Sequence, residues 1–414
     1  MNSFASFPVL LCGISAFCFP ISAFSSDWSQ FRGPNSSGYS ADAQVPLKPK
    51  IDWTAELPGR GLASPIIVGD KVFVTCSSGP KQERLHVISF NAKDGSKLWE
   101  RQLKATGRTM SHPKTSVAAC TPCSDGKRVF ALWSSNDLAA FDLEGNLLWL
   151  RGLTVDYANA SNSLGMASSP VVIGETVVTM IENDSESYTL GIDANTGRNL
   201  WKMERPKSAN WSSPLVWQAD KDSAPVVVLQ SSKGLVAVDP ATGSRLWEYT
   251  DGASTTSSGV VVGDVVYAAS KGITALKPSK TGGEPEQLWR SEQMNPNTVS
   301  LVATGAKIYA LNGAVLSQAD LKTGERGWKI RVADAKTSGG FSGSPVASGD
   351  HVVAVTEKGL LLVVDTTGKE GSVVGSLQLP LKADTKELVL CTPALSGKAI
   401  FLRTDSALWR VGAE

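Results

Sequence analysis

A tryptophan recurs through most of this chain, each time at the end of the same short pattern of residues. The stretch VDPATGSRLWEY at 238–249 shows the pattern: an apolar run, a turn with Asp, Thr and Gly, and a second run containing the tryptophan. The tryptophans lie 39 to 52 residues apart, at Trp53, Trp99, Trp149, Trp201, Trp247, Trp289 and Trp328. In one further copy Leu377 occupies this position. A period of this length predicts an array of small, similar supersecondary units.

A Ser or Thr, usually followed by Pro, opens each unit. These residues are Ser64, Thr121, Ser169, Ser213, Ser258, Ser300, Ser344 and Thr392. In the fourth complete copy the pattern predicts strands at 214–217, 225–230, 235–239 and 244–249. A single sheet of four short strands exposes two edges and two faces, and radial packing of several such sheets covers them. The chain is therefore predicted to be an all-β propeller of four-stranded antiparallel blades.

The last unit is incomplete, and this predicts how the ring closes. After Thr392 the sequence has only three strand-like runs, so residues 51–56 must supply the fourth strand from near the N-terminus. We therefore expect eight blades over residues 51–412, with the N-terminal strand completing the last blade. A tryptophan that repeats around a ring is expected to pack between blades, where the indole N–H can bond to a neighbouring turn.

Two segments precede the propeller. Residues 1–25 are strongly apolar and carry no charge, which predicts a signal peptide, with an uncleaved membrane anchor as the alternative. The protein is then exported to the periplasm or beyond. Residues 26–50 are expected to form an arm that clasps the propeller. In this arm the anchoring aromatic side chains are expected to be Trp28, Phe31 and Tyr39, and Arg32 is expected to pair with a carboxylate.

The overall charge limits the partners of the protein. A net charge of +1 over 414 residues argues against a nucleic-acid binder, which needs a basic face to neutralise phosphates. The sequence also has no run of like charges that would bind a membrane surface. We therefore expect a monomer that binds a protein, a small molecule or a glycan.

Two motifs resemble the pyrroloquinoline quinone (PQQ)-like repeat family. They are D-x-x-T-G-x-x-x-W at 193–201 and 239–247, and S-P-V-V-x-G at 169–174. The lead-in DWSQFRGPNSSGYS at 27–40 is also similar to that of exported PQQ-like proteins of planctomycetes. The resemblance implies a propeller and two kinds of activity. One kind is PQQ-dependent oxidation, and the other is a non-enzymatic scaffold of the BamB type.

The PQQ enzymes of this family hold the quinone with a calcium ion, and they have a catalytic aspartate and a pair of adjacent cysteines. The chain has no adjacent cysteines, and no calcium ligands can be assigned to positions in it. The oxygen-rich run at 182–186 is expected to be a solvated turn. With only three histidines and no second one near His112, the sequence predicts no metal site. His86 and His351 are expected to be packed or surface residues, and no nucleophile-elbow pattern is present.

The cysteines are expected to be structural. Cys120 and Cys123 form a C-x-x-C sequence, but residues three apart in a strand are about 10 Å apart, too far for a disulfide. Cys76 and Cys120 are predicted at the same rim, where an oxidising compartment would permit a disulfide between them.

The connections between blades are unequal, and this unevenness is the best indication of a site. Loops 104–119 and 152–167 are much longer than those at 57–63 and 250–256, and both should lie on the face where the inner strands begin. Loops on a rigid scaffold commonly carry binding residues. The candidate ligand- or partner-binding residues are His112, Lys114, Tyr157, Asn159, Asn162, Asn210, Trp211 and Asn297. The alternative is that these loops only plug the central channel.

The sequence as a whole predicts an exported, non-catalytic binding or assembly scaffold with no catalytic residues assigned. One alternative is a PQQ-dependent oxidoreductase, with PQQ as a cofactor implied by the resemblance alone. The other is a polysaccharide-recognition module in which Trp211 and Tyr157 form stacking surfaces.

Overall fold

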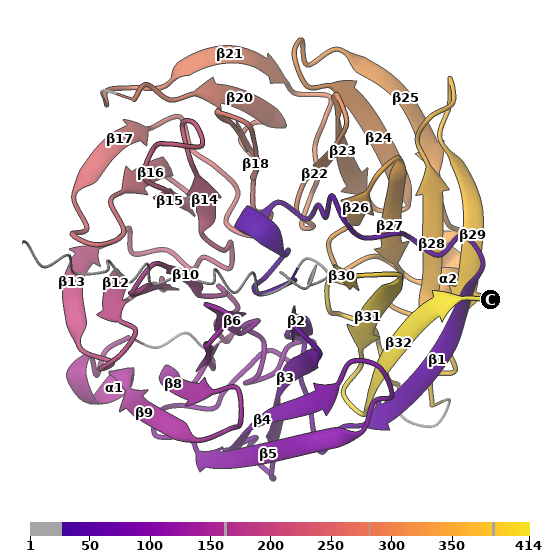
Figure 1. Cartoon of the computed structure of the whole chain (residues 1–414). Coiled ribbons are helices and arrows are strands. Elements are labelled where there is room, and N and C mark those ends of the chain that lie inside the picture. Colours follow the sequence, from indigo (N-terminus) through magenta and orange to yellow (C-terminus); the bar gives the residue numbers. More distant parts are fainter. Residues whose placement is uncertain (1–26, 161–163, 281, 383–385) are drawn as a thin grey trace, which may run out of the picture.

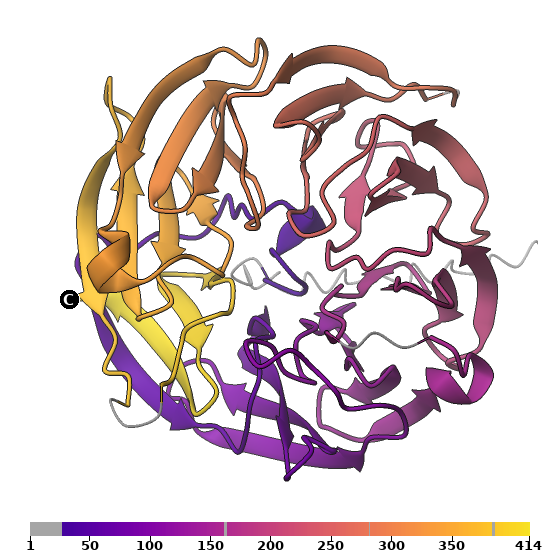
Figure 2. The ribbon, with the colours of Figure 1, turned by 180° about the vertical axis from the view of Figure 1, so that it is seen from behind.

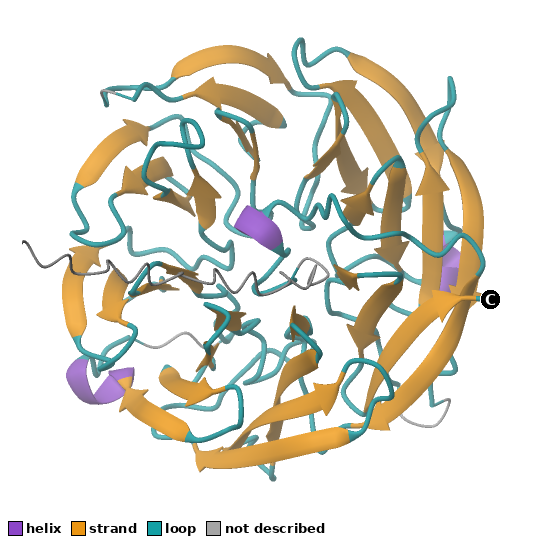
Figure 3. Ribbon diagram, in the orientation of Figure 1, coloured by secondary structure: helices purple, strands orange, loops and turns teal. Residues whose placement is uncertain are grey.

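The protein is a ring of eight antiparallel sheets, each of four strands, arranged around a central axis (Figures 1 and 3). The computed structural model describes residues 27–160, 164–280, 282–382 and 386–414. Apart from strands, the described residues form only three short helical segments: η1 (Pro34–Ser36), α1 (Leu153–Asp156) and α2 (Ala335–Ser338). The predicted all-β, eight-bladed architecture is confirmed. The predicted signal peptide lies outside the described residues.

Seven blades are each built from four consecutive strands. Blade 1 contains β2 (Ile66–Val68), β3 (Lys71–Ser78), β4 (Arg84–Asn91) and β5 (Lys97–Lys104), and blade 2 contains β6 (Cys123–Ser124), β7 (Arg128–Leu132), β8 (Asp137–Asp142) and β9 (Leu147–Gly152). Blade 3 contains β10 (Val171–Ile173), β11 (Thr176–Ile181), β12 (Tyr188–Asp193) and β13 (Asn199–Glu204), and blade 4 contains β14 (Leu215–Trp217), β15 (Val226–Ser231), β16 (Gly234–Val238) and β17 (Arg245–Tyr249). The others are β18 (Val260–Val262), β19 (Val265–Ala268), β20 (Ile273–Lys277) and β21 (Glu286–Ser291) in blade 5; β22 (Val302–Thr304), β23 (Lys307–Asn312), β24 (Val315–Asp320) and β25 (Arg326–Arg331) in blade 6; β26 (Val346–Ser348), β27 (His351–Val355), β28 (Leu360–Asp365) and β29 (Ser372–Gln378) in blade 7.

Blade 8 is built from both ends of the propeller sequence. Its inner strands are β30 (Ala394–Ser396), β31 (Ala399–Arg403) and β32 (Ala407–Ala413), and its outer strand is β1 (Pro49–Glu56). β1 pairs with β32 in antiparallel register, from Pro49 opposite Ala413 to Glu56 opposite Ala407. The predicted closure by the N-terminal strand is therefore confirmed.

The Asp-x-x-Thr-Gly motif forms the hairpin turn between the third and fourth strands of a blade. In blade 4 the Asp239 carboxylate accepts hydrogen bonds from the backbone N–H groups of Ala241 (2.9 Å) and Thr242 (2.8 Å). Gly243 then has a φ of 71°, which a residue with a side chain adopts only at a steric cost. The turn is thus specified by its own residues.

The recurring tryptophans join each blade to the next through this turn. Trp201, for example, donates its indole N–H to the carbonyl of Pro240 (2.8 Å), and a Cβ on Gly243 would lie only 2.6 Å from the indole ring. Equivalent indole bonds to the following blade are made by Trp53, Trp99, Trp149 and Trp289. The turn glycine is therefore needed twice, once for the turn and once for close approach of the ring.

Two members of the series depart from this arrangement. Trp328 packs against Gly371, but its indole nitrogen is buried without a hydrogen-bond partner. The indole nitrogen of Trp247 is also unpartnered, and its ring instead meets Trp217 edge-on at 6.3 Å between centroids.

A ring of hydrogen bonds encircles the axis at the opening residues of the units. The backbone N–H of Ser64 donates to the Thr121 hydroxyl at 2.9 Å, and the N–H of Thr121 donates to the Ser169 hydroxyl at 3.0 Å. The same bond continues from Ser169 to Ser213, Ser258, Ser300, Ser344 and Thr392, with lengths of 2.9–3.1 Å. Seven consecutive junctions are thus linked by one repeated contact.

The N-terminal arm crosses the ring. It starts beside blade 1, where Trp28 forms a bridge with Ile67, and it reaches blade 7, where Tyr39 forms a bridge with Ala347. Between these points the η1 turn lies near the centre of the ring (Figure 1), and Figure 2 shows the same ring from behind. The arm therefore spans the ring near its axis.

Arg32 anchors the middle of the arm, but its partners differ from the expected carboxylate. The fully buried guanidinium donates to the carbonyls of Gly259 (2.7 Å), Ser37 (3.1 Å) and Leu301. Two of these acceptors are the backbone carbonyls that directly precede the inner strands β18 and β22. Burial lowers the pKa of Arg32 to about 9, so the side chain remains charged at neutral pH.

The two kinds of tryptophan contact lead to a prediction. Trp149→Phe should destabilise the protein by about 1 kcal/mol more than Trp328→Phe, because only Trp149 loses a hydrogen bond to the next blade. Both side chains are partly buried, so the apolar loss is similar. Chemical unfolding followed by circular dichroism measures the difference. Equal losses would show that the indole N–H does not contribute to joining the blades.

Candidate functional site

A cavity of about 610 Å³ lies on the axis, on the face that carries the long loops. All eight opening hydroxyl residues, from Ser64 round to Thr392, line it. Phe31 of the arm, which bridges to blades 1 and 7, lines it as well. The propeller axis therefore holds a hydroxyl-lined cavity to which the arm contributes a side chain.

The ring hydroxyls have hydrogen-bonding capacity left for a ligand. In seven of them the oxygen accepts a backbone N–H from the preceding blade, as described above. A hydroxyl group has one donor and two acceptor lone pairs, so each O–H proton can still be donated. The cavity wall thus presents hydroxyl donors whose positions are fixed by their hydrogen bonds to the backbone.

Apolar side chains from several blades line part of the cavity. Trp211 lines the cavity and donates its indole N–H to the carbonyl of Gly165 at 2.9 Å, which fixes the ring against loop 152–167. Leu62, Leu164 and Leu390 add further apolar surface. A few polar groups on a mostly apolar concave surface are typical of small-molecule sites.

The two long loops meet at the mouth of the cavity. The backbone N–H of His112 donates to the carbonyl of Leu164 at 3.0 Å, and the ring Nδ1 of His112 accepts from the N–H of Lys114 at 3.1 Å. The ammonium of Lys114 pairs with Glu357 at 2.7 Å, and the Ser342 hydroxyl donates to the same carboxylate oxygen at 2.7 Å. The positive charge of Lys114 is therefore already balanced.

The structure brings three of the candidate residues to this cavity: His112, Lys114 and Trp211. Asn162 lies outside the described residues. Asn297 has a φ of 57° and lines a smaller cavity beside Phe341. The remaining candidates, treated next, face other parts of the molecule.

Tyr157 packs on the side of blade 3. Its ring lies 4.5 Å from that of Tyr188, with the ammonium of Lys202 at 4.7 Å, and its hydroxyl accepts from Asn199. The carbonyl of Asn159 accepts from the nearby Ser185 hydroxyl. Tyr157 is not among the residues lining the axial cavity, so it does not share a stacking surface with Trp211 there.

Asn210 belongs to a buried network with Glu182 and Arg205. Its amide donates to Glu182 (2.9 Å) and to the carbonyl of Gln230 (2.7 Å), while Arg205 donates to Glu182 at 2.5 Å. Burial raises the pKa of Glu182, and the Arg205 charge opposes that rise. The expectation that 182–186 is a solvated turn is wrong at its start, because Glu182 and Asn183 are almost completely buried.

The four cysteines in the described residues are free thiols, and the disulfide that the sequence permits between Cys76 and Cys120 is not formed. Cys76 packs toward blade 8, where Arg403 donates to its sulfur, whereas Cys120 packs toward blade 3 near the carbonyl of Met166. Cys76 of blade 1 thus faces blade 8, whereas Cys120, just before the first strand of blade 2, faces blade 3. Burial raises the pKa of Cys120 to about 12 and that of Cys391 to about 11.

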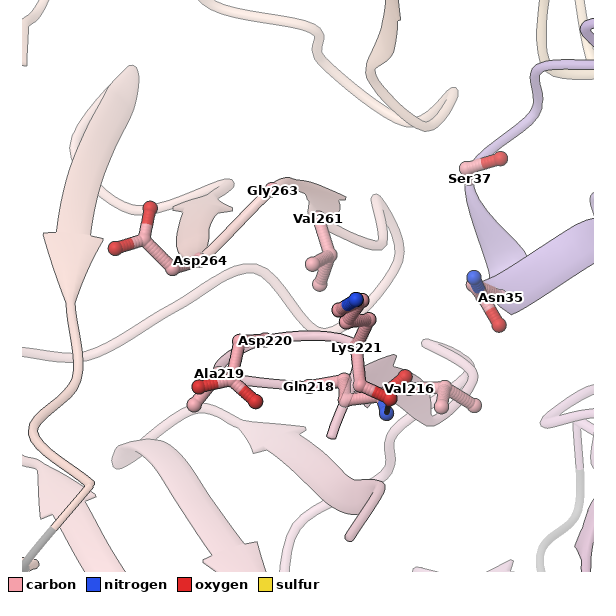
Figure 4. A pocket seen from close by; sticks show the side chains of 10 residues that line it. All are labelled: Asn35, Ser37, Val216, Gln218, Ala219, Asp220, Lys221, Val261, Gly263 and Asp264. Atoms are coloured by element: carbon pink, nitrogen blue, oxygen red, sulfur yellow. Dashed lines mark hydrogen bonds between the residues drawn. The ribbon is translucent and has the colours of Figure 1, made fainter. Parts of the chain in front are cut away.

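A second cavity, of about 490 Å³, lies where the arm meets blades 4 and 5. Figure 4 shows Asn35 and Ser37 on one side of it and Asp220, Lys221 and Asp264 on the other. Hydrogen bonds from Lys280 and Ser223 lower the pKa of Asp220, so this carboxylate already has partners. Among the described residues, no cluster of three His, Cys, Asp or Glu could hold a metal ion.

The Ser and Thr residues that line the cavity were not predicted as site residues, although the repeat pattern marked their positions. The Ser and Thr positions were recognised as the start of each unit, but their convergence on the axis follows only from the closed ring. Phe31 lines the cavity and Glu357 bonds to the lining residue Lys114, both from segments far away in sequence, and no local pattern marks them.

The fold and the hydroxyl-lined axis define the class: an eight-bladed propeller of PQQ-like repeats. The family model described as "Outer membrane protein assembly factor BamB" matches residues 48–186 and 165–330, which is more than half of the chain. The chain belongs to this family. In the described residues, no helix has the length and apolar character needed to cross a membrane.

Two known proteins with sequences similar to the chain are dehydrogenases. Polyvinylalcohol dehydrogenases of Pseudomonas sp. and of Sphingopyxis sp. (strain 113P3) are each 25% identical, over 52% and 50% of this chain but only 37% and 36% of their own length. The chain thus matches little more than a third of these relatives.

Solved structures share the fold at low sequence identity. BamB from Moraxella catarrhalis has a TM-score of 0.62 and 16% identity, covering 88% of this chain and 97% of that one. A europium-containing methanol dehydrogenase has a TM-score of 0.68 and 11% identity, covering 94% and 98%. The quinohemoprotein alcohol dehydrogenase of Comamonas testosteroni has a TM-score of 0.66 and 12% identity, covering 94% and 80%.

The buried cysteines lead to a prediction about reactivity. Because burial raises their pKa values, the thiols of Cys76, Cys120, Cys123 and Cys391 should carry almost no thiolate at pH 8. They should resist iodoacetamide in the native protein and react after unfolding in guanidinium, as read by peptide mass mapping. A Cys76–Cys120 cross-linked peptide in a non-reducing digest would contradict the assignment of free thiols.

Proposed function

We propose that this protein is an exported propeller whose axial cavity is a non-catalytic binding site for a small organic ligand. One observation carries the proposal: an axial cavity of about 610 Å³ combines repeated hydroxyls, a fixed indole and the two longest loops. Its volume is in the range of sites that enclose small molecules. Export is supported by the apolar N-terminal 25 residues.

The cavity wall indicates the chemistry of the ligand. The hydroxyls suit a ligand with several hydroxyl or carbonyl oxygens, and Trp211 suits one flat face. Lys114 is paired with Glu357, so the mouth does not present an unbalanced positive charge. A neutral, oxygen-rich ligand is the best match, and a sugar has these properties.

The residues present do not fit a quinone held by a metal ion. PQQ could lie flat on Trp211, but the described residues contain no group of three His, Cys, Asp or Glu for a metal. The described lining residues include no Asp or Glu, and the carboxylate bonded to two of them, Glu357, is occupied by Lys114 and Ser342. For this reason no reaction step is assigned to the cavity.

The second candidate function is a PQQ-dependent oxidoreductase. Similarity to the two polyvinylalcohol dehydrogenases over half of the chain favours it, as does the shared fold with a methanol and an alcohol dehydrogenase. The first candidate is preferred because it rests on the residues of this cavity.

Calorimetry with the purified chain tests the proposal. The probes are glucose, maltotriose, and PQQ with and without calcium. At least one probe should bind without calcium, and Trp211→Ala should weaken that binding at least tenfold, or about 1.4 kcal/mol, through loss of stacking. Tyr157→Ala, which removes an aromatic ring away from the cavity, should leave binding within twofold.

Two outcomes would overturn the proposal. The first is that no probe binds, or that Trp211→Ala has no effect on binding. The second is dye-linked oxidation of methanol or polyvinyl alcohol that requires PQQ and calcium and disappears in Trp211→Ala. The second result would establish the oxidoreductase instead.

A further inference from the structure

Blade 1 contains a hydrogen-bonded chain of Ser78, His86 and Glu100 that the axial cavity does not use. The Ser78 hydroxyl lies 2.7 Å from Nε2 of His86, and Nδ1 of His86 lies 2.8 Å from Oε1 of Glu100. The residues come from β3, β4 and β5, which lie side by side in Figure 1. None of the three lines the axial cavity.

The strand register explains why these side chains meet. Ser78 is opposite Arg84, and His86 is two residues further along β4, so Ser78 and His86 are diagonal neighbours. His86 is opposite Gln102, and Glu100 is again its diagonal neighbour. Diagonal pairs on one face of a sheet are within reach of long side chains. All three side chains therefore share one face of the blade.

The proton positions follow from the chemistry of the groups. Burial opposes ionisation of Glu100, but hydrogen bonds from Lys97 and His86 outweigh it and lower the pKa of Glu100. An ionised carboxylate only accepts hydrogen bonds, so Nδ1 of His86 carries the proton. In neutral imidazole Nε2 then accepts, and Ser78 must donate its O–H to it. This is the arrangement of an activated serine nucleophile.

The surroundings of the three residues differ in exposure. His86 is only 2% exposed, whereas Ser78, at the end of β3, is partly exposed. Arg84 lies directly opposite Ser78 and Lys104 directly opposite Arg84, and both are exposed. Opposite residues share a face, so the exposed Arg84 lies on the same face as Ser78, on the neighbouring strand, with Lys104 one strand further.

We propose that Ser78, His86 and Glu100 form an acyl-transfer site on the rim of blade 1 that hydrolyses carboxylic esters. Ser78 Oγ attacks the ester carbonyl carbon while His86 Nε2 takes its proton. Collapse of the tetrahedral species breaks the bond to the alcohol, which leaves with that proton. Water, deprotonated by His86, then releases the acid and restores Ser78. Glu100 is a positioning residue, and Arg84, on the same face as Ser78, is the cation assigned to the developing oxyanion.

A fluorophosphonate probe on the purified full chain tests the nucleophile. Peptide mapping should find the label on Ser78, and both Ser78→Ala and His86→Gln should abolish it. Ser96→Ala is the matched control, because Ser96 is an exposed serine of the same blade that bonds to Asp94 instead of a histidine. Label on Ser78 no greater than on Ser96, in protein with wild-type circular dichroism, would overturn the proposal.

Hydrolysis of p-nitrophenyl acetate tests the reaction itself. Ser78→Ala and His86→Gln should each lower kcat/KM at least tenfold. Glu100→Gln should lower kcat with KM within twofold, and Glu100→Asp should restore part of kcat, which a purely structural carboxylate would not do. A wild-type rate no higher than that of the Ser78→Ala variant would contradict the assignment. Sugar or quinone binding at the axis is measured separately, so either proposal can fail alone.

Discussion

The structure depends on one repeated hydrogen bond, from the backbone N–H that opens each blade to the hydroxyl that opens the next. The bond recurs at seven consecutive junctions around the axis. This bond links neighbouring inner strands at the axis. Because the repeated Ser or Thr side chain is small and polar, the side chains leave a cavity at the axis and do not fill it. The same contact therefore determines both the fold and the presence of a cavity.

The outer part of the ring uses a different contact. There the indole rings pack on the turn glycines of the following blade, and five of them also donate a hydrogen bond. The arm then adds a single, unrepeated element, with Arg32 bound to carbonyls of two blades and Phe31 in the cavity wall. Repeated contacts thus build the scaffold, and unrepeated segments determine the shape of the site.

The repeat made the fold predictable, because each blade carries its own turn and interface residues. The blade-4 strands were predicted within about a residue of their observed bounds, and the closure by β1 followed from the missing strand. The site was predicted only in part. His112, Lys114 and Trp211 reach the cavity, but Tyr157 turns outward onto Tyr188, and nothing in its sequence position distinguishes these directions.

Other contacts could not be predicted because they join residues that are distant in sequence. Arg32 donates hydrogen bonds to carbonyls of blades 5 and 6 and not to the expected carboxylate. Glu182 accepts hydrogen bonds from Arg205 and Asn210 and is not solvated as expected. The role of His86 depends on a diagonal register between three strands, which sequence spacing alone does not give. The central claim is that the axial cavity binds a small organic ligand, and a crystal structure with the tightest-binding probe tests it most directly. The account predicts that ligand lies against Trp211 and within hydrogen-bonding distance of the Ser and Thr ring. Ligand bound anywhere else on the propeller would contradict it.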